Sequence, residues 1–345
     1  MTKYPEKIPN TEQLDEILST PTPEIIKLFS RLDGDIMFLG ISGKIGPTLA
    51  RMTTRACREA GVRKKIIGVS LFESEEQRKG IECFGIETIH GDLLNTDFIK
   101  SLPTPKNVIF LAGMKFGSEE NLSLTWAVNS YLPALVAERF RKSRIVAFST
   151  GCVYPLVPVQ SGGSLETDKP APLGEYAQSC LGRERMFEYG SMQNKTPVSL
   201  IRLNYAVEMR YGVLVDIALK VKNNIPVDLS MGFFNVIWQG DANAMILRAL
   251  EHCESPAKII NITGPETASV RQVAQLFGEY LNTKPKFEKQ EAETALLSNA
   301  QLSYNLFGHP KVPLDQIIHW IADWINNEKE LLGKPTHYEV RNGKY

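Results

Sequence analysis

Short apolar runs alternate with longer amphipathic segments along most of this chain. Apolar runs of four to eight residues bounded by turn residues are typical of buried strands, whereas apolar residues three or four apart indicate helices. Five such runs predict strands at residues 35–39, 64–70, 86–92, 107–113 and 144–150. Because a parallel sheet is covered by helices on both faces, this alternation predicts an α/β fold with a doubly wound parallel sheet.

The first predicted strand leads into a glycine-rich turn and then a helix. Gly40, Gly43 and Gly46 stand three residues apart in the segment from Asp35 to Arg51. A turn without side chains lets the backbone approach an anion, and the following helix directs its free N–H groups and positive dipole end toward that anion. The pattern therefore predicts a turn that binds the diphosphate of a dinucleotide.

The end of the second strand bears on which dinucleotide is bound. Folds selective for NAD place an acidic residue there to accept from the ribose 2′-OH, but this chain has Ser70. The missing carboxylate permits a 2′-phosphate, with Arg78 and Lys79 as more distant cations. The sequence thus predicts NADP or NAD, with NADP preferred. The alternative for Arg78 and Lys79 is an ordinary solvated helix face.

Composition and charge narrow the class of partner. The 39 basic residues balance the 39 acidic residues, so we expect neither nucleic acid nor a membrane as a partner, but a small molecule. The five cysteines form no C-x-x-C pair, and the N-terminus lacks an apolar signal segment. We therefore expect a reducing, cytoplasmic location. The five histidines show no metal-ligand spacing, so no metal site is predicted.

Several motifs follow one another in order between residues 33 and 330, namely GISGKIG, HGDL, LAGMKFG, FSTGCVYP, YAQSC, RLNYA and NITGPETASV. In this order they resemble the extended short-chain dehydrogenase/reductases, the NAD-dependent epimerase/dehydratase family. The resemblance implies a Rossmann-like NAD(P)-binding domain at 33–204. It also implies a smaller substrate lobe at 205–330, from which 236–254 return to the core.

The two ends of the chain lie outside this resemblance. Residues 1–32 carry two short amphipathic patterns and predict a helical extension, which serves for packing or as a homodimer contact. Residues 331–345 form a polar tail that we expect to fray.

The resemblance also implies positions for the cofactor. It places Asp92 near the adenine, Gly113 and Lys115 near the diphosphate or ribose, and Asn129 in the helix beside the site. The full set of expected cofactor-binding residues is Gly40, Ser42, Gly43, Lys44, Ile45, Gly46, Ser70, Asp92, Leu93, Leu111, Ala112, Gly113, Lys115, Asn129, Tyr176 and Asn204.

In the family, a tyrosine moves a hydroxyl proton while a hydride moves to or from the nicotinamide, and a serine or threonine holds the same oxygen. The matching residues are Tyr176 and Thr150, with Ser149 adjacent. The family lysine four residues after the tyrosine is replaced by Cys180. Three interpretations follow: Lys115 supplies the missing charge together with an oxidised nicotinamide, Tyr176 acts as a neutral acid, or the protein binds cofactor without turnover.

The expected substrate is carbohydrate-like, and the reaction is an oxidoreduction or epimerisation at a secondary alcohol or ketone. Candidate substrate contacts are Phe116, Cys152, Asn204 and Arg210. Nucleotide-sugar members of the family carry an arginine where this chain has Phe233 and Phe234. A free sugar or sugar acid is therefore as compatible as a nucleotide sugar. Cys152 and Cys180 are either inert or, as the alternative, a nucleophile or redox switch.

Overall fold

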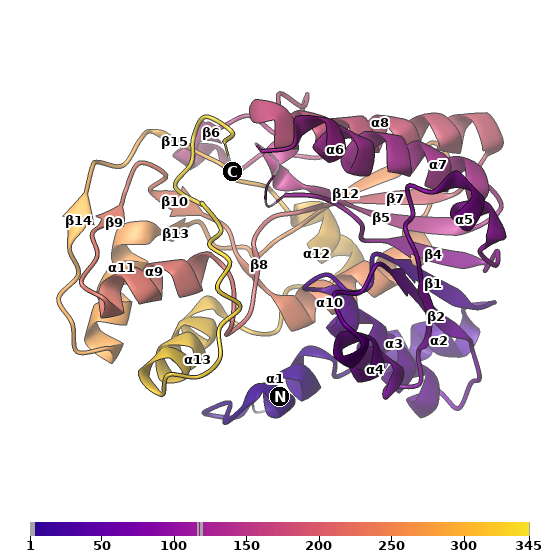
Figure 1. The fold of residues 1–345 in the computed structure, drawn as a ribbon. Helices are drawn as coiled ribbons and strands as arrows, with labels where there is room; N and C mark the ends of the chain where they lie inside the picture. Colours follow the sequence, from indigo (N-terminus) through magenta and orange to yellow (C-terminus); the bar gives the residue numbers. More distant parts are fainter. Residues whose placement is uncertain (1–3, 116, 118–119, 345) are drawn as a thin grey trace.

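A seven-stranded parallel sheet forms the centre of the larger part of the molecule (Figure 1). The structure is a computed structural model that describes residues 4–115, 117 and 120–344. The strand order is β12-β7-β5-β4-β1-β2-β3, and every neighbouring pair is parallel. The strands are β1 (Ile36–Leu39), β2 (Ile66–Ser70), β3 (Glu87–His90), β4 (Asn107–Phe110), β5 (Arg144–Thr150), β7 (Val198–Leu203) and β12 (Lys258–Ile262). The predicted doubly wound parallel sheet is thus confirmed.

Helices cover both faces of this sheet because successive strand residues point to opposite sides. Ile36 and Phe38 of β1 join one core cluster, whereas Met37 and Leu39 join the other. The first face is covered by α2 (Pro23–Arg31), α3 (Gly46–Glu59), α10 (Gln239–Arg248) and α12 (Gln301–Phe307). The second is covered by α5 (Thr96–Ser101), α7 (Leu132–Arg139) and α8 (Gly174–Asn194), while α4 (Glu75–Glu82) packs beside β3 and α6 (Leu122–Trp126) beside α8.

A smaller lobe is built on three helices that pack against one another: α9 (Val213–Lys222), α11 (Val270–Tyr280) and α13 (Leu314–Asn326). Their apolar faces form a separate core that includes Trp320 and Trp324. Short strand pairs complete this part of the molecule: β6 (Val157–Pro158) with β15 (Thr294–Ala295), β8 (Ala206–Val207) with β11 (Ile237–Trp238), β9 (Val227–Asp228) with β14 (Phe287–Glu288), and β10 (Phe233–Phe234) with β13 (Ala268–Ser269).

The segment that returns from the lobe to the larger sheet is longer than predicted. The sequence limited this return to 236–254, but β12 at 258–262 is the edge strand beside β7, and α12 packs on the same sheet. The polar residue Asn261 interrupts the apolar run of β12, so hydrophobic periodicity alone does not predict this strand.

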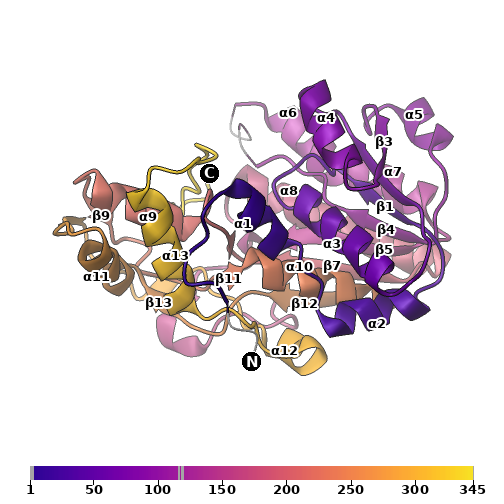
Figure 2. The same cartoon turned by 90° about the horizontal axis from the view of Figure 1, so that it is seen from below.

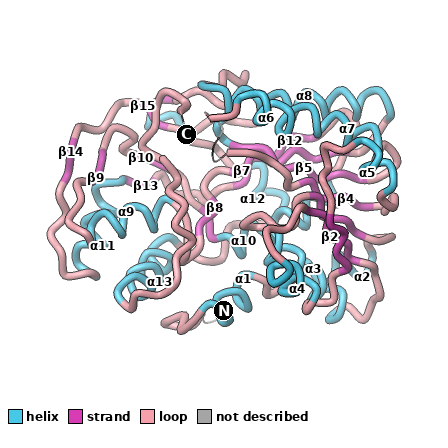
Figure 3. The backbone as a smooth tube through the Cα atoms, viewed as in Figure 1, coloured by secondary structure: helices cyan, strands magenta, loops and turns pink. Residues whose placement is uncertain are grey.

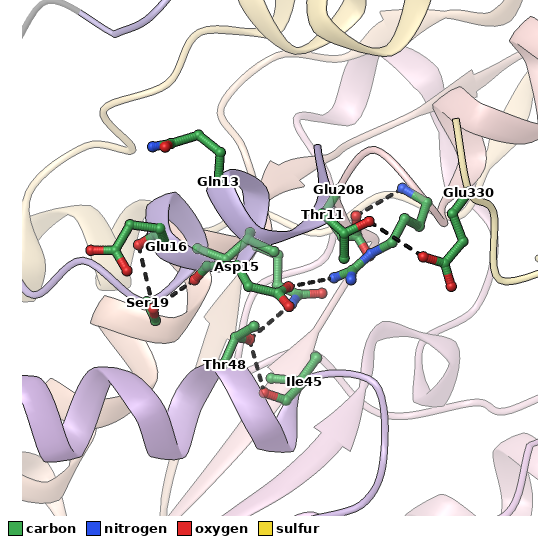
Figure 4. Close-up of polar contacts among 12 residues, drawn as sticks. Thr11, Gln13, Asp15, Glu16, Ser19, Ile45, Thr48, Glu208 and Glu330 are labelled. Atoms are coloured by element: carbon green, nitrogen blue, oxygen red, sulfur yellow. Dashed lines mark hydrogen bonds and ion pairs between the residues drawn. The ribbon is translucent and has the colours of Figure 1, made fainter. Parts of the chain in front are cut away.

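The N-terminal extension packs on its own chain. Helix α1 (Thr11–Leu18) buries Leu14 and Leu18 in the core of the lobe, while α2 belongs to the larger domain. Glu16 of α1 pairs with Arg51 and Arg55 of α3, at 2.5 and 2.7 Å. Figures 2 and 4 show α1 lying beside the start of α3. This extension therefore joins the two lobes of one chain, in agreement with the packing alternative.

The polar tail does not fray, contrary to the sequence-based expectation. It follows α13 without helix or strand (Figure 3) and runs beside α9 toward β15 (Figure 1). Thr336 is 2% exposed and Tyr338 is 1% exposed. The backbone N–H of Thr336 and its hydroxyl both donate to Asp216 of α9, and Arg341 donates to Thr294. The polar side chains hold the tail because they find buried partners.

Among the described helices, none has the length and apolar composition needed to cross a membrane.

Candidate active site

The glycine turn between β1 and α3 needs the absence of a side chain at two of its three glycines, and the third leaves space above the turn. Gly40 has φ +87°, and a Cβ there would lie 2.7 Å from the backbone nitrogen of Ala112. A Cβ on Gly46 would lie 2.0 Å from the carbonyl oxygen of Ile41. At Gly43 a Cβ would have, among the described atoms, only the Gly40 oxygen nearby, at 3.6 Å, so the described residues leave the space above it open. Gly40 and Gly46 shape the turn, whereas Gly43 leaves room for a ligand.

The start of α3 is suited to an anion. Its N-cap residue is Ile45, whose side chain makes no capping hydrogen bond, and Pro47 lies in the first turn. The first N–H groups of a helix lack partners within the helix, and a side chain or an anion can bind them. Here no side chain at the N-cap takes that place. The predicted diphosphate position is therefore consistent with the backbone geometry.

Lys44 lies within this turn and is packed against the smaller lobe. Its Nζ is 3.1 Å from the centroid of the Tyr211 ring, a cation–π contact. Burial, together with the charges of Lys115 and Lys334, lowers the pKa of Lys44 to about 7, while Asp216 and Glu208 act in the opposite direction. An anion bound at the turn would favour the protonated form of Lys44 and so raise its pKa.

At the end of β2, the expected adenosine-ribose position contains hydroxyls rather than charges. The hydroxyl oxygens of Ser42 and Ser70 are 2.5 Å apart. The guanidinium of Arg78 donates to Glu82 and Thr88, at 3.1 and 2.8 Å, and is not turned toward Ser70. Lys79 is exposed. The structure therefore gives the predicted preference for NADP no support.

The residues after β3 and β4 lie where the sequence placed them, at the carboxyl edge of the sheet. Asp92 is exposed and its carboxylate accepts from the backbone of Leu94, while Leu93 is buried. The backbone N–H groups of Leu111 and Ala112 both donate to the carbonyl oxygen of Leu39. These bonds fix the loop after β4 next to the glycine turn.

Asn129 holds this loop from the side of the helices. Its side chain accepts from the backbone N–H of Met114 and donates to the carbonyl oxygen of Met114, both at 2.9 Å. Asn129 is fully buried in a π-helical turn, Ala127–Tyr131, that separates α6 from α7. Such turns occur frequently at functional sites because they redirect a side chain. Here the turn directs Asn129 at the loop that carries Gly113 and Lys115.

Tyr176 and Cys180 lie on one face of α8, and their side chains are close enough to form a hydrogen bond. Burial first, and then Cys180 and Cys152, raise the pKa of Tyr176 well above its usual range, whereas Arg183 lowers it. Burial raises the pKa of the Cys180 thiol to about 11. A thiol that remains protonated near pH 7 is a poor nucleophile, which argues against the thiol-chemistry alternative at Cys180.

The two candidate hydroxyls at the end of β5 face different surroundings. Thr150 accepts from the backbone N–H of Cys152, at 3.1 Å, and so caps a short 3-10 turn, Gly151–Val153. Ser149 points to the buried side of the sheet and donates to Glu184 at 2.5 Å. Thr150 is therefore the better placed of the two for a substrate oxygen.

Lys115 and Arg210 bind protein groups. The Lys115 amine donates to the carbonyl oxygen of Thr336 in the tail, at 3.1 Å, and burial lowers its pKa. Arg210 pairs with Glu208 and with Asp15 of α1, each at 2.9 Å. The predicted substrate role of Arg210 would require these two carboxylates to release it. The other candidate, Phe116, lies outside the described residues.

Asn204 follows β7 and lies against Gly151. A Cβ on Gly151 would be 3.0 Å from the side chain of Asn204, and the Asn204 amide nitrogen is buried without a partner among the described atoms. A buried donor without a partner is costly and often marks a ligand contact. This observation is consistent with the predicted role of Asn204 beside the cofactor or substrate.

Residues 36–207 match the model of the NAD dependent epimerase/dehydratase family. The chain belongs to this family. The matched residues contain β1 to β7, the glycine turn and the helix with Tyr176. The family match thus covers the residues predicted to bind the cofactor and ends at β8, before the three helices of the smaller lobe.

Solved structures with the same fold include three epimerases. A UDP-glucuronic acid 4-epimerase from Bacillus cereus, in complex with UDP-glucuronic acid and NAD, has a TM-score of 0.70 at 16% identity, over 85% of this chain and 99% of its own. The UDP-glucose 4-epimerase of Thermotoga maritima, with UDP-glucose, has a TM-score of 0.70 at 17% identity, over 85% and 99%. The UDP-glucose 4-epimerase of Thermus thermophilus, in complex with NAD, has a TM-score of 0.68 at 19% identity, over 84% of this chain and 98% of its own. A comparison with curated protein sequences finds no match.

Two residues that the family motifs do not indicate are buried next to the site, Arg183 and Glu184 of α8. They follow Tyr176 by seven and eight residues, so they lie two helical turns further along. The carboxylate of Glu184 forms an ion pair with Arg202 of β7 and accepts from Ser149. The only sequence signal was a pair of charges within the span of the tyrosine helix, which is equally typical of a solvated face.

Proposed function

We propose that this protein is an NAD(P)-dependent oxidoreductase or epimerase that acts on a secondary alcohol or ketone of a carbohydrate-like molecule. The observation that carries the proposal is that the uncapped glycine turn after β1 and Thr150 at the end of β5 share the carboxyl edge of one parallel sheet, with Tyr176 on the helix that packs against β5. Ligands of open parallel sheets bind at this edge. The family of the chain and the NAD bound in similar structures support the same assignment.

The residues present fit a nicotinamide dinucleotide. The open space above Gly43 and the uncapped α3 suit its diphosphate, and the loop held by Asn129 borders the same place. Bound there, the nicotinamide would supply the acceptor or donor of a hydride. Thr150 would hold the reacting oxygen, and Tyr176 would take or give its proton.

The substrate class depends on which side chains of the smaller lobe could bind a diphosphate. The similar structures were solved with UDP-sugars, but Arg210 of this chain is already bound by two carboxylates, and Phe233 and Phe234 form β10. A sugar or sugar acid therefore competes with a nucleotide sugar as the substrate, and both belong in the test. A catalytically silent NAD(P)-binding protein is the second candidate, because a neutral thiol at Cys180 cannot replace an ammonium group.

The test is to purify the protein, look for bound nicotinamide by absorbance and fluorescence, and measure hydride transfer with UDP-sugars, free sugars and sugar acids. We expect cofactor binding and turnover of at least one substrate. Tyr176→Phe should keep the cofactor and lower kcat by at least about a hundredfold, the scale of general acid–base catalysis. Undiminished turnover in Tyr176→Phe would show that another group carries the proton. Binding without turnover would favour the silent protein.

Cofactor affinity is expected to fall as the pH rises from about 6 to 9. The pKa of Lys44 in the free protein is about 7, and a diphosphate would raise it, so binding above pH 7 must take up a proton. The association constant should then fall by up to about tenfold per pH unit above pH 7. Calorimetry in buffers of different ionisation enthalpy measures this proton uptake.

Lys44→Met is the matched variant for this measurement. It should bind the cofactor more weakly at pH 6 but with little pH dependence. A wild-type affinity that is constant between pH 6 and 9 would contradict the assignment of Lys44 to the diphosphate.

A further inference from the structure

Helix α8 carries a second cationic candidate beyond the position where the family lysine is missing. Tyr176, Cys180 and Arg183 stand at positions i, i+4 and i+7 and therefore share one face of the helix. Cys180 is fully buried and Arg183 is 5% exposed. A guanidinium remains charged in proteins, so this face holds a fixed positive charge one turn past the thiol.

The partners of Arg183 are uncharged. It donates to the carbonyl oxygen of Phe148 at 2.9 Å and to the side-chain oxygen of Asn129 at 2.6 Å, and its Nε has no partner among the described atoms. The adjacent carboxylate, Glu184, is bound by Arg202. Burying a charge is costly unless hydrogen bonds or another charge compensate it. Arg183 is therefore held by two hydrogen bonds and the Phe110 ring, and among the described residues no carboxylate forms an ion pair with it.

The same guanidinium lies directly against the loop after β4. A Cβ on Gly113 would be 2.6 Å from the terminal nitrogen of Arg183, so the loop passes over the cation with no side chain between them. Asn129 accepts from Arg183 while it holds both backbone groups of Met114. Arg183 thus connects the tyrosine helix to the loop expected beside the cofactor.

Lys115, the other candidate cation, lies close enough to Cys152 and Cys180 for their charges to act on it, but it is not among the charges that act on Tyr176. Its amine donates to the tail carbonyl of Thr336. Among the charges that act on Tyr176, Arg183 favours the ionised phenol, whereas Cys180 and Cys152 oppose it.

We propose that Arg183 is a positioning residue that supplies, on the Tyr176 face of α8, the positive charge missing at Cys180, and that fixes the cofactor loop through Asn129. The inference rests on the proposed function. In the oxidation of a substrate alcohol, the C–H bond breaks as its electron pair leaves as hydride for the oxidised nicotinamide. The hydroxyl proton passes to the Tyr176 oxygen, and a C=O bond remains. Arg183 acts through its charge and through Asn129, without touching the substrate.

Two variants separate charge from hydrogen bonding. Arg183→Gln keeps donors for Phe148 and Asn129 but removes the charge, whereas Arg183→Lys keeps the charge but loses the planar fork. The matched control is Arg185→Gln on the same helix, because Arg185 is exposed and paired only with Glu188 in its described ion pairs. Adding Cys180→Lys to Arg183→Gln restores a charge at the family position.

The first readout does not need turnover. In protein labelled with fluorotyrosine, the 19F signal of Tyr176, assigned by its absence in Tyr176→Phe, is titrated with alkali. Arg183→Gln should move the titration midpoint up by at least about one pH unit, the size expected for loss of a nearby opposite charge. Arg183→Lys and the double variant with Cys180→Lys should move it back, and Arg185→Gln should leave it unchanged.

The second readout is the pH profile of kcat for the substrate found in the panel. The acidic limb of this profile should move to higher pH in Arg183→Gln and back to the wild-type pH in Arg183→Lys. Equal effects of Gln and Lys, or no effect beyond that of Arg185→Gln, would overturn the inference and leave Arg183 as a structural strut. Failure of the wild-type protein to bind any nicotinamide cofactor would instead reject the proposed function, while the 19F titration would still decide the role of Arg183.

Discussion

Glu184→Ala is expected to lower the free energy of unfolding by about 3–5 kcal/mol, the cost of breaking a buried ion pair by removing one partner. The Glu184 carboxylate accepts from Arg202 at 3.0 and 2.8 Å, and both side chains are at most 1% exposed. Without the carboxylate, the guanidinium of Arg202 would stay buried with Tyr154 as its remaining described hydrogen-bond partner, at 2.7 Å. Urea denaturation followed by circular dichroism measures the loss.

The control for this variant is Glu188→Ala, one turn further along the same helix. Glu188 pairs with Arg185 at 2.6 Å, but the Arg185 side chain is half exposed. Exposed pairs contribute at most about 1 kcal/mol. Replacing both buried partners, as Glu184→Leu with Arg202→Met, should recover much of the stability because no buried charge remains. A Glu184→Ala variant as stable as the Glu188→Ala control would show that the buried pair adds nothing.

Gly46→Ala should abolish measurable cofactor binding and destabilise the fold. Its new methyl group would lie 2.0 Å from the Ile41 carbonyl oxygen, which is backbone and cannot rotate away. Overpacking of this kind costs about 1–3 kcal/mol. Because α3 starts at Gly46, relief of the clash must also move the helix end from its position at the turn. Calorimetric titration with NAD and thermal unfolding measure the two losses separately.

Gly43→Ala distinguishes a damaged turn from an obstructed ligand site. Its methyl group would meet only ordinary contact at 3.6 Å, so stability should be close to that of the wild type. If the diphosphate lies above Gly43, its affinity should still fall at least about tenfold. Gly80→Ala in α4, where nothing lies within 4 Å, controls for the glycine substitution itself. Unchanged NAD affinity in Gly43→Ala would place the diphosphate elsewhere.

The sequence predicted the parts of the fold that depend on uninterrupted local patterns. The apolar runs of β1, β2, β4 and β5 are buried on both faces, as a parallel sheet requires. Two further strands of the sheet, β7 and β12, were not among the five expected runs. Their sequences contain Arg202 and Asn261, which are buried through hydrogen bonds to distant residues. Local hydrophobicity cannot reveal such partners.

The site was predictable to the extent that it depends on motifs with fixed spacing. The glycine turn, Asn129 and Tyr176 follow β1, β4 and β5 in the chain, and these three strands are neighbours in the sheet. Arg183 could not be distinguished from a solvated charge until its burial was known. Arg210 looked available for a substrate, but Asp15, 195 residues earlier in the chain, binds it. Contacts over such separations depend on the tertiary fold and not on periodicity.

The tail completes the surroundings of the candidate site last during protein synthesis. The bond from Lys115 to Thr336 spans 221 residues, and Gly343 packs against Leu173 and Gly174 at the start of the tyrosine helix. Domains can fold as the chain leaves the ribosome, beginning from the N-terminus. A nascent chain that has emerged only to β12 could already pair all seven strands of its sheet. It would still lack the contacts around Lys115 and the tyrosine helix until translation had passed residue 343.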